Sequence, residues 1–218
     1  MKISSDTVAL VTGASRGLGY ATAVELAGQG AHIIALARTV GGLEELDDEI
    51  KSVGGTATLV PLDITEEEGL QRMCLSIFER WGRIDLLVHC AAHAEPLSPV
   101  PHISDKNFDR CMAVNARATQ RIIALTDPLL RAAPEGTAMF IEDHHEGEKF
   151  FTAYAASKAA SNAIVDAWAA ETARLSPRVL KFRPAPMPTA LRARFYPGED
   201  REKLSPPDVE AAKLVALL

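Results

Sequence analysis

The chain has 218 residues, of which 47% are hydrophobic and 24% are charged, and these values exclude a disordered, collagen-like or coiled-coil protein. The 23 basic and 29 acidic side chains give a net charge of −6, which is the wrong sign for a protein that binds nucleic-acid phosphates. The length predicts one domain over residues 1–218, since it is short for two domains of ordinary size.

Short aliphatic runs alternate with longer segments of helical period, a pattern typical of βαβ units that wind a parallel sheet. Six strands are predicted at residues 8–12, 32–36, 58–62, 85–90, 138–141 and 179–182. Helices are predicted between them at residues 16–29, 42–53, 66–80, 105–131 and 152–175. The predicted fold is therefore α/β, with a doubly wound parallel sheet in three layers.

Residues 183–207 interrupt this rhythm, because they hold six of the 13 prolines. We expect a loop there, lying over the functional site as a lid. A further helix is predicted to begin near Pro206 and Pro207, and the chain stops at Leu218 within a helical pattern.

A glycine-rich turn, Thr12-Gly-Ala-Ser-Arg-Gly-Leu-Gly19, joins the first strand to the first helix. Small residues let the backbone approach the phosphates of a dinucleotide, and the start of the helix offers unpaired N–H groups to their charge. The alternative is a tight turn without a ligand. The strand-to-helix context favours a phosphate site, and the predicted contacts in the turn are Gly13, Ser15, Arg16, Gly17, Leu18 and Gly19.

The end of the second strand bears on the choice of cofactor. An acid usually binds the free ribose hydroxyls of NAD(H) at this place, but the sequence has Leu36-Ala37-Arg38. Arg38 and Arg16 suit a 2′-phosphate, so NADP(H) is favoured over NAD(H), unless the two arginines are only solvated. Asp63 is predicted to contact the adenine, with the alternative that it caps the helix after Thr65.

Tyr154 and Lys158 lie four residues apart and therefore share one face of the predicted helix 152–175. A tyrosine is a poor acid or base at neutral pH, whereas a neighbouring ammonium group would lower the pKa of the phenol toward the working range. The alternative is a chance pair at helical spacing. The pair predicts general acid/base chemistry.

The glycine turn, Asp63, Asn115 and the Tyr154–Lys158 pair occur in the order of the classical short-chain dehydrogenase/reductase family, which residues 6–190 resemble. The resemblance implies a Rossmann-type sheet, a nicotinamide cofactor and hydride transfer between a carbonyl and an alcohol. It implies that Tyr154 is the general acid/base, that Lys158 binds the nicotinamide ribose, and that Asn115 holds a water molecule. Asn115 has a structural alternative, in which it bends or bridges its own helix.

The chain departs from the family pattern after the fourth and sixth strands. His89-Cys-Ala-Ala92 replaces the family's Asn-Asn-Ala-Gly, and His89 is interpreted as a structural hydrogen bonder at the strand end. Pro184-Ala185 replaces Pro-Gly, while Thr189 is placed to meet the nicotinamide carboxamide. The remaining predicted cofactor contacts are Ile64, Cys90, Ala91, Ala92, Pro184 and Thr189.

The family's catalytic serine has no counterpart between Thr137 and Ala153. Asp143 falls at its place, or Glu142 if the register slips by one residue. An ionised carboxylate cannot donate a hydrogen bond to a carbonyl, although a carboxyl buried among apolar groups can stay protonated and do so. Two functions remain open: an NADP(H)-dependent oxidoreductase for a small carbonyl or alcohol, and a catalytically weak protein that binds dinucleotide for structure or sensing.

The run Glu142-Asp-His-His-Glu146 is interpreted as a solvated charged loop rather than a metal site, because consecutive side chains on an extended segment point to opposite sides. No metal is expected.

Location and assembly are expected from the whole chain. An odd number of cysteines, no signal peptide and no apolar stretch of about 18 residues predict a cytoplasmic protein that does not enter a membrane. The helices 105–131 and 152–175 resemble the family's dimer surface. Because the chain stops before the family's final strand, we expect six strands and a homodimer rather than a tetramer.

Overall fold

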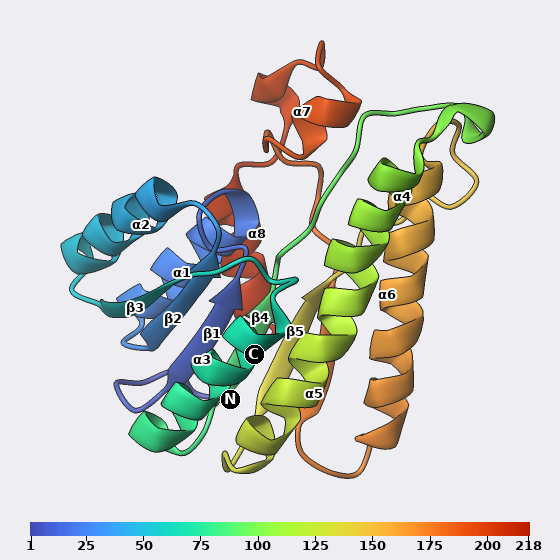
Figure 1. Ribbon diagram of the computed structural model, residues 1–218. Helices are drawn as coiled ribbons and strands as arrows, with labels where there is room; N and C mark the ends of the chain where they lie inside the picture. Colours follow the sequence, from blue (N-terminus) through green and yellow to red (C-terminus); the bar gives the residue numbers. More distant parts are fainter.

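Six strands form one parallel sheet in the computed structural model, which describes residues 1–218 (Figure 1). The strand order β3-β2-β1-β4-β5-β6 reverses direction between β1 and β4, which is the doubly wound arrangement that the sequence predicts. The strands are β1 (Val8–Thr12), β2 (His32–Ala37), β3 (Thr56–Pro61), β4 (Leu86–His89), β5 (Thr137–Ile141) and β6 (Arg178–Phe182). The predicted fold class and number of strands are confirmed.

Eight α-helices accompany the sheet, with short 3₁₀ turns at Val100–His102 and Arg201–Lys203. None of the helices combines the length and the apolar composition needed to span a bilayer. The helices are α1 (Gly17–Gly28), α2 (Val40–Ser52), α3 (Glu67–Trp81), α4 (Asp105–Cys111), α5 (Ala118–Arg131), α6 (Thr152–Glu171), α7 (Arg192–Phe195) and α8 (Pro207–Val215).

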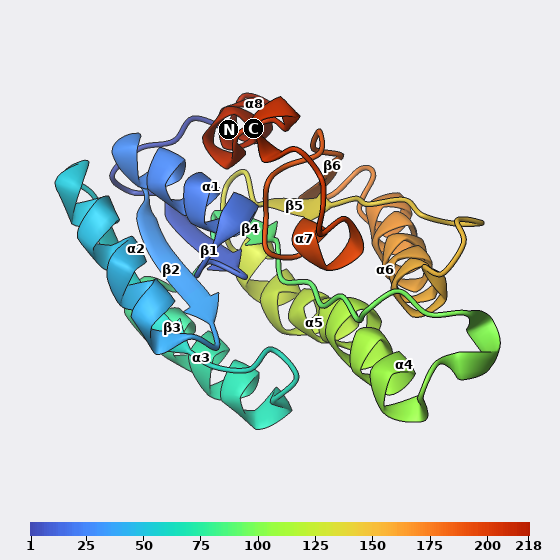
Figure 2. The ribbon, with the colours of Figure 1, turned by 90° about the horizontal axis from the view of Figure 1, so that it is seen from above.

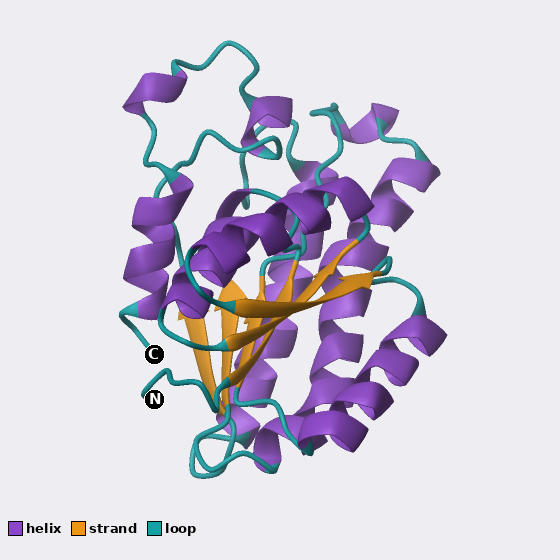
Figure 3. Ribbon diagram, turned by 90° about the vertical axis from the view of Figure 1, so that its left-hand side faces the viewer, coloured by secondary structure: helices purple, strands orange, loops and turns teal.

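The helices cover both faces of the sheet and make three layers (Figures 2 and 3). Strand β1 is buried throughout, and its residues alternate between the two faces. Val8 and Leu10 pack with α3, α5 and α6 in one core, while Ala9 and Val11 pack with α1, α2 and α8 in the other. Because all the strands are parallel, their carboxyl ends lie at one edge of the sheet.

Each amphipathic helix turns one apolar stripe toward the sheet. In α3 the buried residues Leu70, Met73, Cys74 and Ile77 recur at intervals of three and four positions. Complete burial of such a side chain stabilises the fold by roughly 2 kcal/mol. The helix ends at Gly82, which has a φ of 71° and so adopts the left-handed conformation that terminates many helices.

Several boundaries differ from the sequence prediction. Strand β3 begins two residues before 58, α2 begins two residues before 42, and α6 ends four residues before 175. The predicted helix 105–131 contains a π-helical segment at Met112–Arg117 between α4 and α5. The predicted loop 183–207 is not wholly irregular, because it contains α7 and the 3₁₀ turn at Arg201–Lys203. These ends depend on tertiary contacts that local periodicity does not record.

Candidate active site

A cavity of about 430 Å³ opens at the carboxyl edge of the sheet, where β1 and β4 diverge. Ligands of doubly wound sheets bind at this switch point. The predicted cofactor and catalytic residues all line the cavity, although their roles stay predictions: Gly13, Ser15, Arg16, Gly17, Leu18, Gly19, Arg38, Asp63, Ile64, Cys90, Ala91, Ala92, Asn115, Asp143, Tyr154, Lys158, Pro184 and Thr189.

The glycine turn lies against the segment that follows β4. Gly13 has a φ of 69°, and a Cβ atom there would lie 2.8 Å from the backbone nitrogen of Ala91. Thr12 adds a link, because its hydroxyl accepts a hydrogen bond from the same backbone nitrogen at 3.2 Å. A Cβ on Gly19 would lie 2.5 Å from the carbonyl oxygen of Gly13. Only glycine fits at Gly13 without moving the backbone.

The amino terminus of α1 faces this turn without a capping side chain. Arg16 occupies the N-cap position and makes no side-chain cap bond, and the first turn of α1 contains no acid. The first N–H groups of α1 are therefore available to an anion, which the helix dipole also favours. Together with the space kept open by Gly13, this donor set fits the pyrophosphate of a dinucleotide.

Two arginines lie at the end of β2. The Arg16 guanidinium donates to the Thr39 hydroxyl at 3.5 Å, and Arg38 is exposed, with its guanidinium 3.7 Å from a carboxyl oxygen of Asp63. Ala37 occupies the last position of β2, where an acid would repel a phosphate. Thr39, which directly follows Arg38 in the chain, is not among the predicted contacts.

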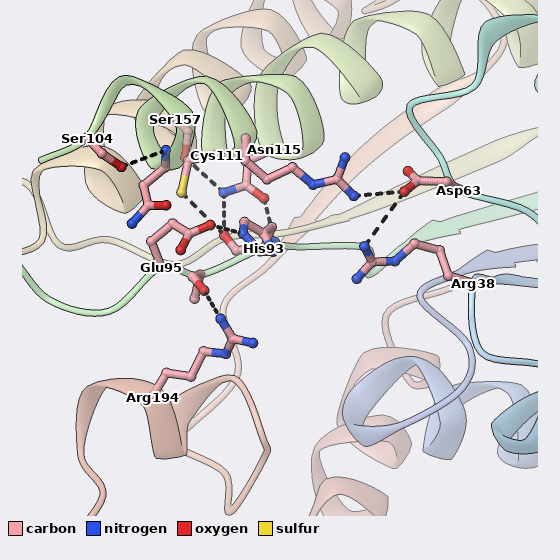
Figure 4. Close-up of polar contacts among 12 residues, drawn as sticks. Arg38, Asp63, His93, Glu95, Ser104, Cys111, Asn115, Ser157 and Arg194 are labelled. Atoms are coloured by element: carbon pink, nitrogen blue, oxygen red, sulfur yellow. Dashed lines mark hydrogen bonds and ion pairs between the residues drawn. The ribbon is translucent and has the colours of Figure 1, made fainter.

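Asp63 is held in a turn and in ion pairs at once (Figure 4). One carboxyl oxygen accepts bonds from the backbone N–H and the hydroxyl of Thr65, and the other accepts a 2.7 Å bond from Arg110. Burial alone would raise the pKa of Asp63, but the bonds from Arg110 and Thr65 lower it to about 2. Asp63 therefore forms a turn with Thr65 but does not cap α3, whose N-cap residue is Glu66, so the capping alternative is wrong.

Asn115 braces the segment after β4 from within the π-helical segment (Figure 4). Its side-chain oxygen accepts a 2.7 Å bond from the backbone nitrogen of His93, and its amide donates to the backbone oxygen of His93 and to the hydroxyl of Ser157, each at 2.8 Å. Both amide donors are used. The side chain thus ties the β4 loop to α6, and its water-holding role stays a prediction.

His89 lies between two threonine hydroxyls. Its Nδ1 is 2.9 Å from the hydroxyl of Thr12, and its Nε2 is 3.1 Å from that of Thr119. Burial, with a smaller effect from Lys158, lowers the pKa of His89 to about 3. A buried neutral imidazole with both nitrogens paired matches the structural interpretation of this residue.

Tyr154 and Lys158 are buried together on α6. The Tyr154 hydroxyl donates a 2.7 Å bond to Asp143, while the Lys158 ammonium donates a 2.7 Å bond to the backbone oxygen of Ile141. Burial, followed by the charge of Asp143, raises the pKa of Tyr154 well above its ordinary value. The expectation that Lys158 lowers this pKa is wrong for the protein without a ligand, because burial and Asp143 dominate. The phenol is a proton donor at neutral pH.

Comparison with known proteins decides the family. A family model described as short chain dehydrogenase matches residues 7–200. The chain belongs to the short-chain dehydrogenase family. The short-chain dehydrogenase/reductase FrzI of a Cladobotryum species is 33% identical over 190 residues, which cover 86% of this chain and 73% of that protein.

Solved structures share the whole fold of this short-chain dehydrogenase. The oxidoreductase yciK from E. coli has a TM-score of 0.89 at 29% identity, covering 98% of this chain and 89% of that chain. A metagenomic short-chain oxidoreductase in complex with NADP has a TM-score of 0.84 at 27% identity, covering 100% and 91% of the two chains. The Rossmann-type sheet and the membership in an oxidoreductase family are thereby confirmed.

In this short-chain dehydrogenase Asp143, not Glu142, contacts the tyrosine. Glu142 pairs with Lys181 at 2.7 Å, so the two acids separate to opposite sides of the strand end. The side chain of Asp143 is 39% exposed. That environment differs from the buried apolar one that a protonated donor carboxyl needs.

The run 142–146 is not a uniformly solvated loop. His144 is 3.7 Å from Glu142 and pairs with Glu146 on one side, while His145 contacts Asp143 on the other. The side chain of His145 is only 10% exposed, which corrects the solvated interpretation for this residue. Its burial depends on neighbours from distant segments, and no local signal indicates them.

Part of the segment 183–207 lines the cavity, while its role as a lid stays a prediction. Thr189 approaches Gly17, where an added Cβ would meet its methyl group at 3.3 Å. In α7, Phe195 packs edge-on against the Tyr154 ring at a centroid distance of 4.9 Å, and Arg194 donates a 2.7 Å bond to the backbone oxygen of Ala94 (Figure 4). The segment therefore contacts both the glycine turn and Tyr154.

Proposed function

We propose that this short-chain dehydrogenase is an NADP(H)-dependent oxidoreductase that interconverts a neutral carbonyl compound and its alcohol, with reduction as the favoured direction. The observation that carries the proposal is the shared cavity, which joins the uncapped start of α1 to the buried Tyr154 hydroxyl. The family supports oxidoreductase chemistry. Three structural neighbours are complexed with NADP or 5-hydroxy-NADP, which supports the cofactor.

The residues of the cavity suggest how the cofactor is held. The glycine turn and α1 would bind the pyrophosphate, Arg16, Arg38 and Thr39 the 2′-phosphate, and Asp63 with Ile64 the adenine side. Lys158 would bind the nicotinamide ribose, close to the small residues at 90–92 and to Pro184 and Thr189. When bound, the nicotinamide supplies or accepts the hydride.

Tyr154 is proposed as the group that protonates the carbonyl oxygen. Its raised pKa keeps the proton on the phenol, which suits reduction and opposes the phenolate that oxidation requires. Asp143 holds the hydroxyl in the cavity. We propose Asn115 and Lys158 as supporting residues, Asn115 through the β4 loop and Lys158 through the ribose.

The walls around Tyr154 suggest a neutral, apolar substrate. Ile141, Met187 and Leu191 line the cavity together with Tyr154, whereas the aromatic cluster of Phe151, Phe195 and Tyr196 packs outside its lining. Asp143 beside the reacting position would repel a carboxylate on the substrate. A ketone or aldehyde with an apolar substituent therefore fits this side of the cavity.

The cofactor proposal is tested by titrating NADPH against the protein and following the nicotinamide fluorescence, with NADH in parallel. We expect saturable binding, tighter for NADPH, that is lost in Gly17→Asp, because a carboxylate would replace the open phosphate site at a φ of 59°. No saturable change, or an unaltered Gly17→Asp variant, would contradict the proposal.

Catalysis is tested with a panel of ketones and aldehydes in the presence of NADPH. We expect turnover that falls by about a hundredfold or more in Tyr154→Phe. NADPH binding without any turnover would instead favour a protein that binds dinucleotide for structure or sensing.

A cytoplasmic homodimer formed through α4–α5 and α6 is also proposed, and sedimentation velocity would measure its mass.

A further inference from the structure

His145 lies behind the Asp143 carboxyl that contacts the proposed proton donor. One oxygen of Asp143 accepts the 2.7 Å bond from Tyr154, and the other lies 3.1 Å from Nε2 of His145. On the far side of the ring, Nδ1 of His145 lies 3.0 Å from a carboxyl oxygen of Glu148, which is exposed. A continuous row of polar groups thus runs from solvent to the phenol.

The imidazole ring is fixed by aromatic packing. It stacks on Phe151 with a centroid distance of 4.1 Å and an interplanar angle of 5°, and Phe195 lies 5.9 Å away. Nδ1 is buried and has no partner in hydrogen-bond geometry, since the Glu148 oxygen approaches off the N–H direction. The 3.1 Å contact of Nε2 with Asp143 is likewise a close polar contact without hydrogen-bond geometry. A buried ring nitrogen without a hydrogen bond, in a row that ends at Tyr154, calls for a functional explanation.

We propose that His145 is a positioning residue that holds the Asp143 carboxyl against the Tyr154 hydroxyl. This inference rests on the proposed function, because it assigns a positioning residue to the proton donor of the same reaction. This role does not include the contact with substrate that the family's serine makes. It accounts for the carboxyl that stands at the place of that serine.

The proton balance is simple. In the proposed reduction, Tyr154 gives its proton to the carbonyl oxygen and then regains one proton from solvent. Before the transfer, Asp143 accepts the hydrogen bond of the Tyr154 hydroxyl, and His145 keeps the carboxyl in place for it. One solvent proton is consumed for each alcohol formed. Because the Asp143 charge raises the pKa of Tyr154, the phenolate is a strong acceptor for the returning proton.

Other charged groups also act on this row. Lys158 from α6 and Arg192 from α7 interact with the Asp143 charge, and Tyr196 faces both Asp143 and Glu148. Within the segment 142–148, the charge of His145 acts on the Glu146 carboxyl. Arg192 is neutralised by Glu199 through a paired contact at 2.5 and 2.6 Å. The groups in direct contact with His145 are thus the two carboxyls and the aromatic rings.

The first test needs no substrate or cofactor. Ring nitrogen NMR signals of His145, assigned with His145→Gln, are compared among variants of the free protein. We expect these signals to move in Asp143→Asn, in Glu148→Gln and in Tyr154→Phe, because the row couples the phenol to the ring. Glu146→Gln serves as the matched control and should produce a smaller change. Signals that ignore both Asp143→Asn and Tyr154→Phe would overturn the proposal.

The second test is the pH profile of kcat with NADPH and the best carbonyl of the panel. We expect His145→Gln to reduce kcat by about tenfold with unchanged NADPH affinity. The pH at which kcat changes should also shift in His145→Gln, because the variant removes the imidazole beside Asp143. His144→Gln, next in the chain and paired with Glu142 and Glu146, should behave like the wild type.

The outcomes separate the two proposals. Loss of turnover in Tyr154→Phe together with a wild-type profile in His145→Gln would overturn the role of His145 and leave the proposed function in place. An unaffected Tyr154→Phe variant would contradict the proposed function itself.

Discussion

The glycine turn and the segment 142–148 line the same cavity, but different forces hold them. The turn is fixed by backbone contact, since a Cβ atom on Gly13 would lie only 2.8 Å from the backbone nitrogen of Ala91, in the loop after β4. The segment 142–148 is fixed by side chains, through the bond from Tyr154 to Asp143 and the polar contacts of His145. The first region should therefore respond to added volume, and the second to changes of charge and pH.

Gly13→Val should have the largest effect, because it adds volume where the backbone leaves none. Strain at a φ of 69° and overlap with Ala91 should together lower the free energy of unfolding by about 3 kcal/mol and abolish NADPH binding. Chemical denaturation and fluorescence titration measure both. Gly41→Ala in α2 is the matched control, since no atom lies within 4 Å of its added Cβ. If both variants were equally stable, backbone contact would not fix the turn.

Asp63→Asn tests how much one charged side chain contributes to stability on the side of the cavity where the glycine turn is held by backbone contact. The folded pKa of Asp63 is about 2, below the ordinary 3.8, so the ionised carboxyl stabilises the fold above about pH 4 and this contribution is lost as the pH falls toward 2. We expect the variant to lose about 2 kcal/mol at pH 7.

The difference between wild type and Asp63→Asn should shrink in acid, which urea unfolding at several pH values would show. Glu68→Gln is the control, because Glu68 is 91% exposed and only 3.8 Å from Arg72. A difference that stayed constant from pH 7 down to pH 3 would mean that the charge of Asp63 contributes nothing.

Arg38→Ala should have the smallest effect, confined to one cofactor. Loss of a charge-assisted contact to the 2′-phosphate should weaken NADPH binding about tenfold, or about 1.4 kcal/mol, and leave NADH binding unchanged. Arg72→Ala, on exposed α3, is the control. An equal loss of affinity for NADPH and NADH would show that Arg38 does not recognise the 2′-phosphate.

The sequence predicts the half of the site that depends on local pattern. The spacing of Gly13, Gly17 and Gly19 after a strand fixes the turn, and four residues between Tyr154 and Lys158 fix their shared face. The alternation of strands and helices likewise predicts the order of the fold. These features need only neighbours in the chain, so one sequence is enough to find them.

The remainder depends on contacts between distant segments. Arg110 reaches Asp63 from 47 positions away, and His145 is buried by Phe151 and Phe195, which no local pattern indicates. The sign of the pKa change at Tyr154 also depends on burial and on Asp143, which outweigh the Lys158 effect inferred from helical spacing. The course of the loops and the burial of side chains therefore determine the pKa of Tyr154 and the contacts of Asp63 and His145, which the motifs alone do not.

The most direct measurement follows deuterium from NADPH deuterated at both C4 positions into the alcohol product, for the wild type and Tyr154→Phe. We predict one deuterium per product molecule in the wild type. In Tyr154→Phe the rate should fall by about a hundredfold or more while NADPH affinity is unchanged. Product without deuterium, or transfer at the wild-type rate in Tyr154→Phe, would contradict the assignment of Tyr154 as the proton donor beside a bound NADP(H).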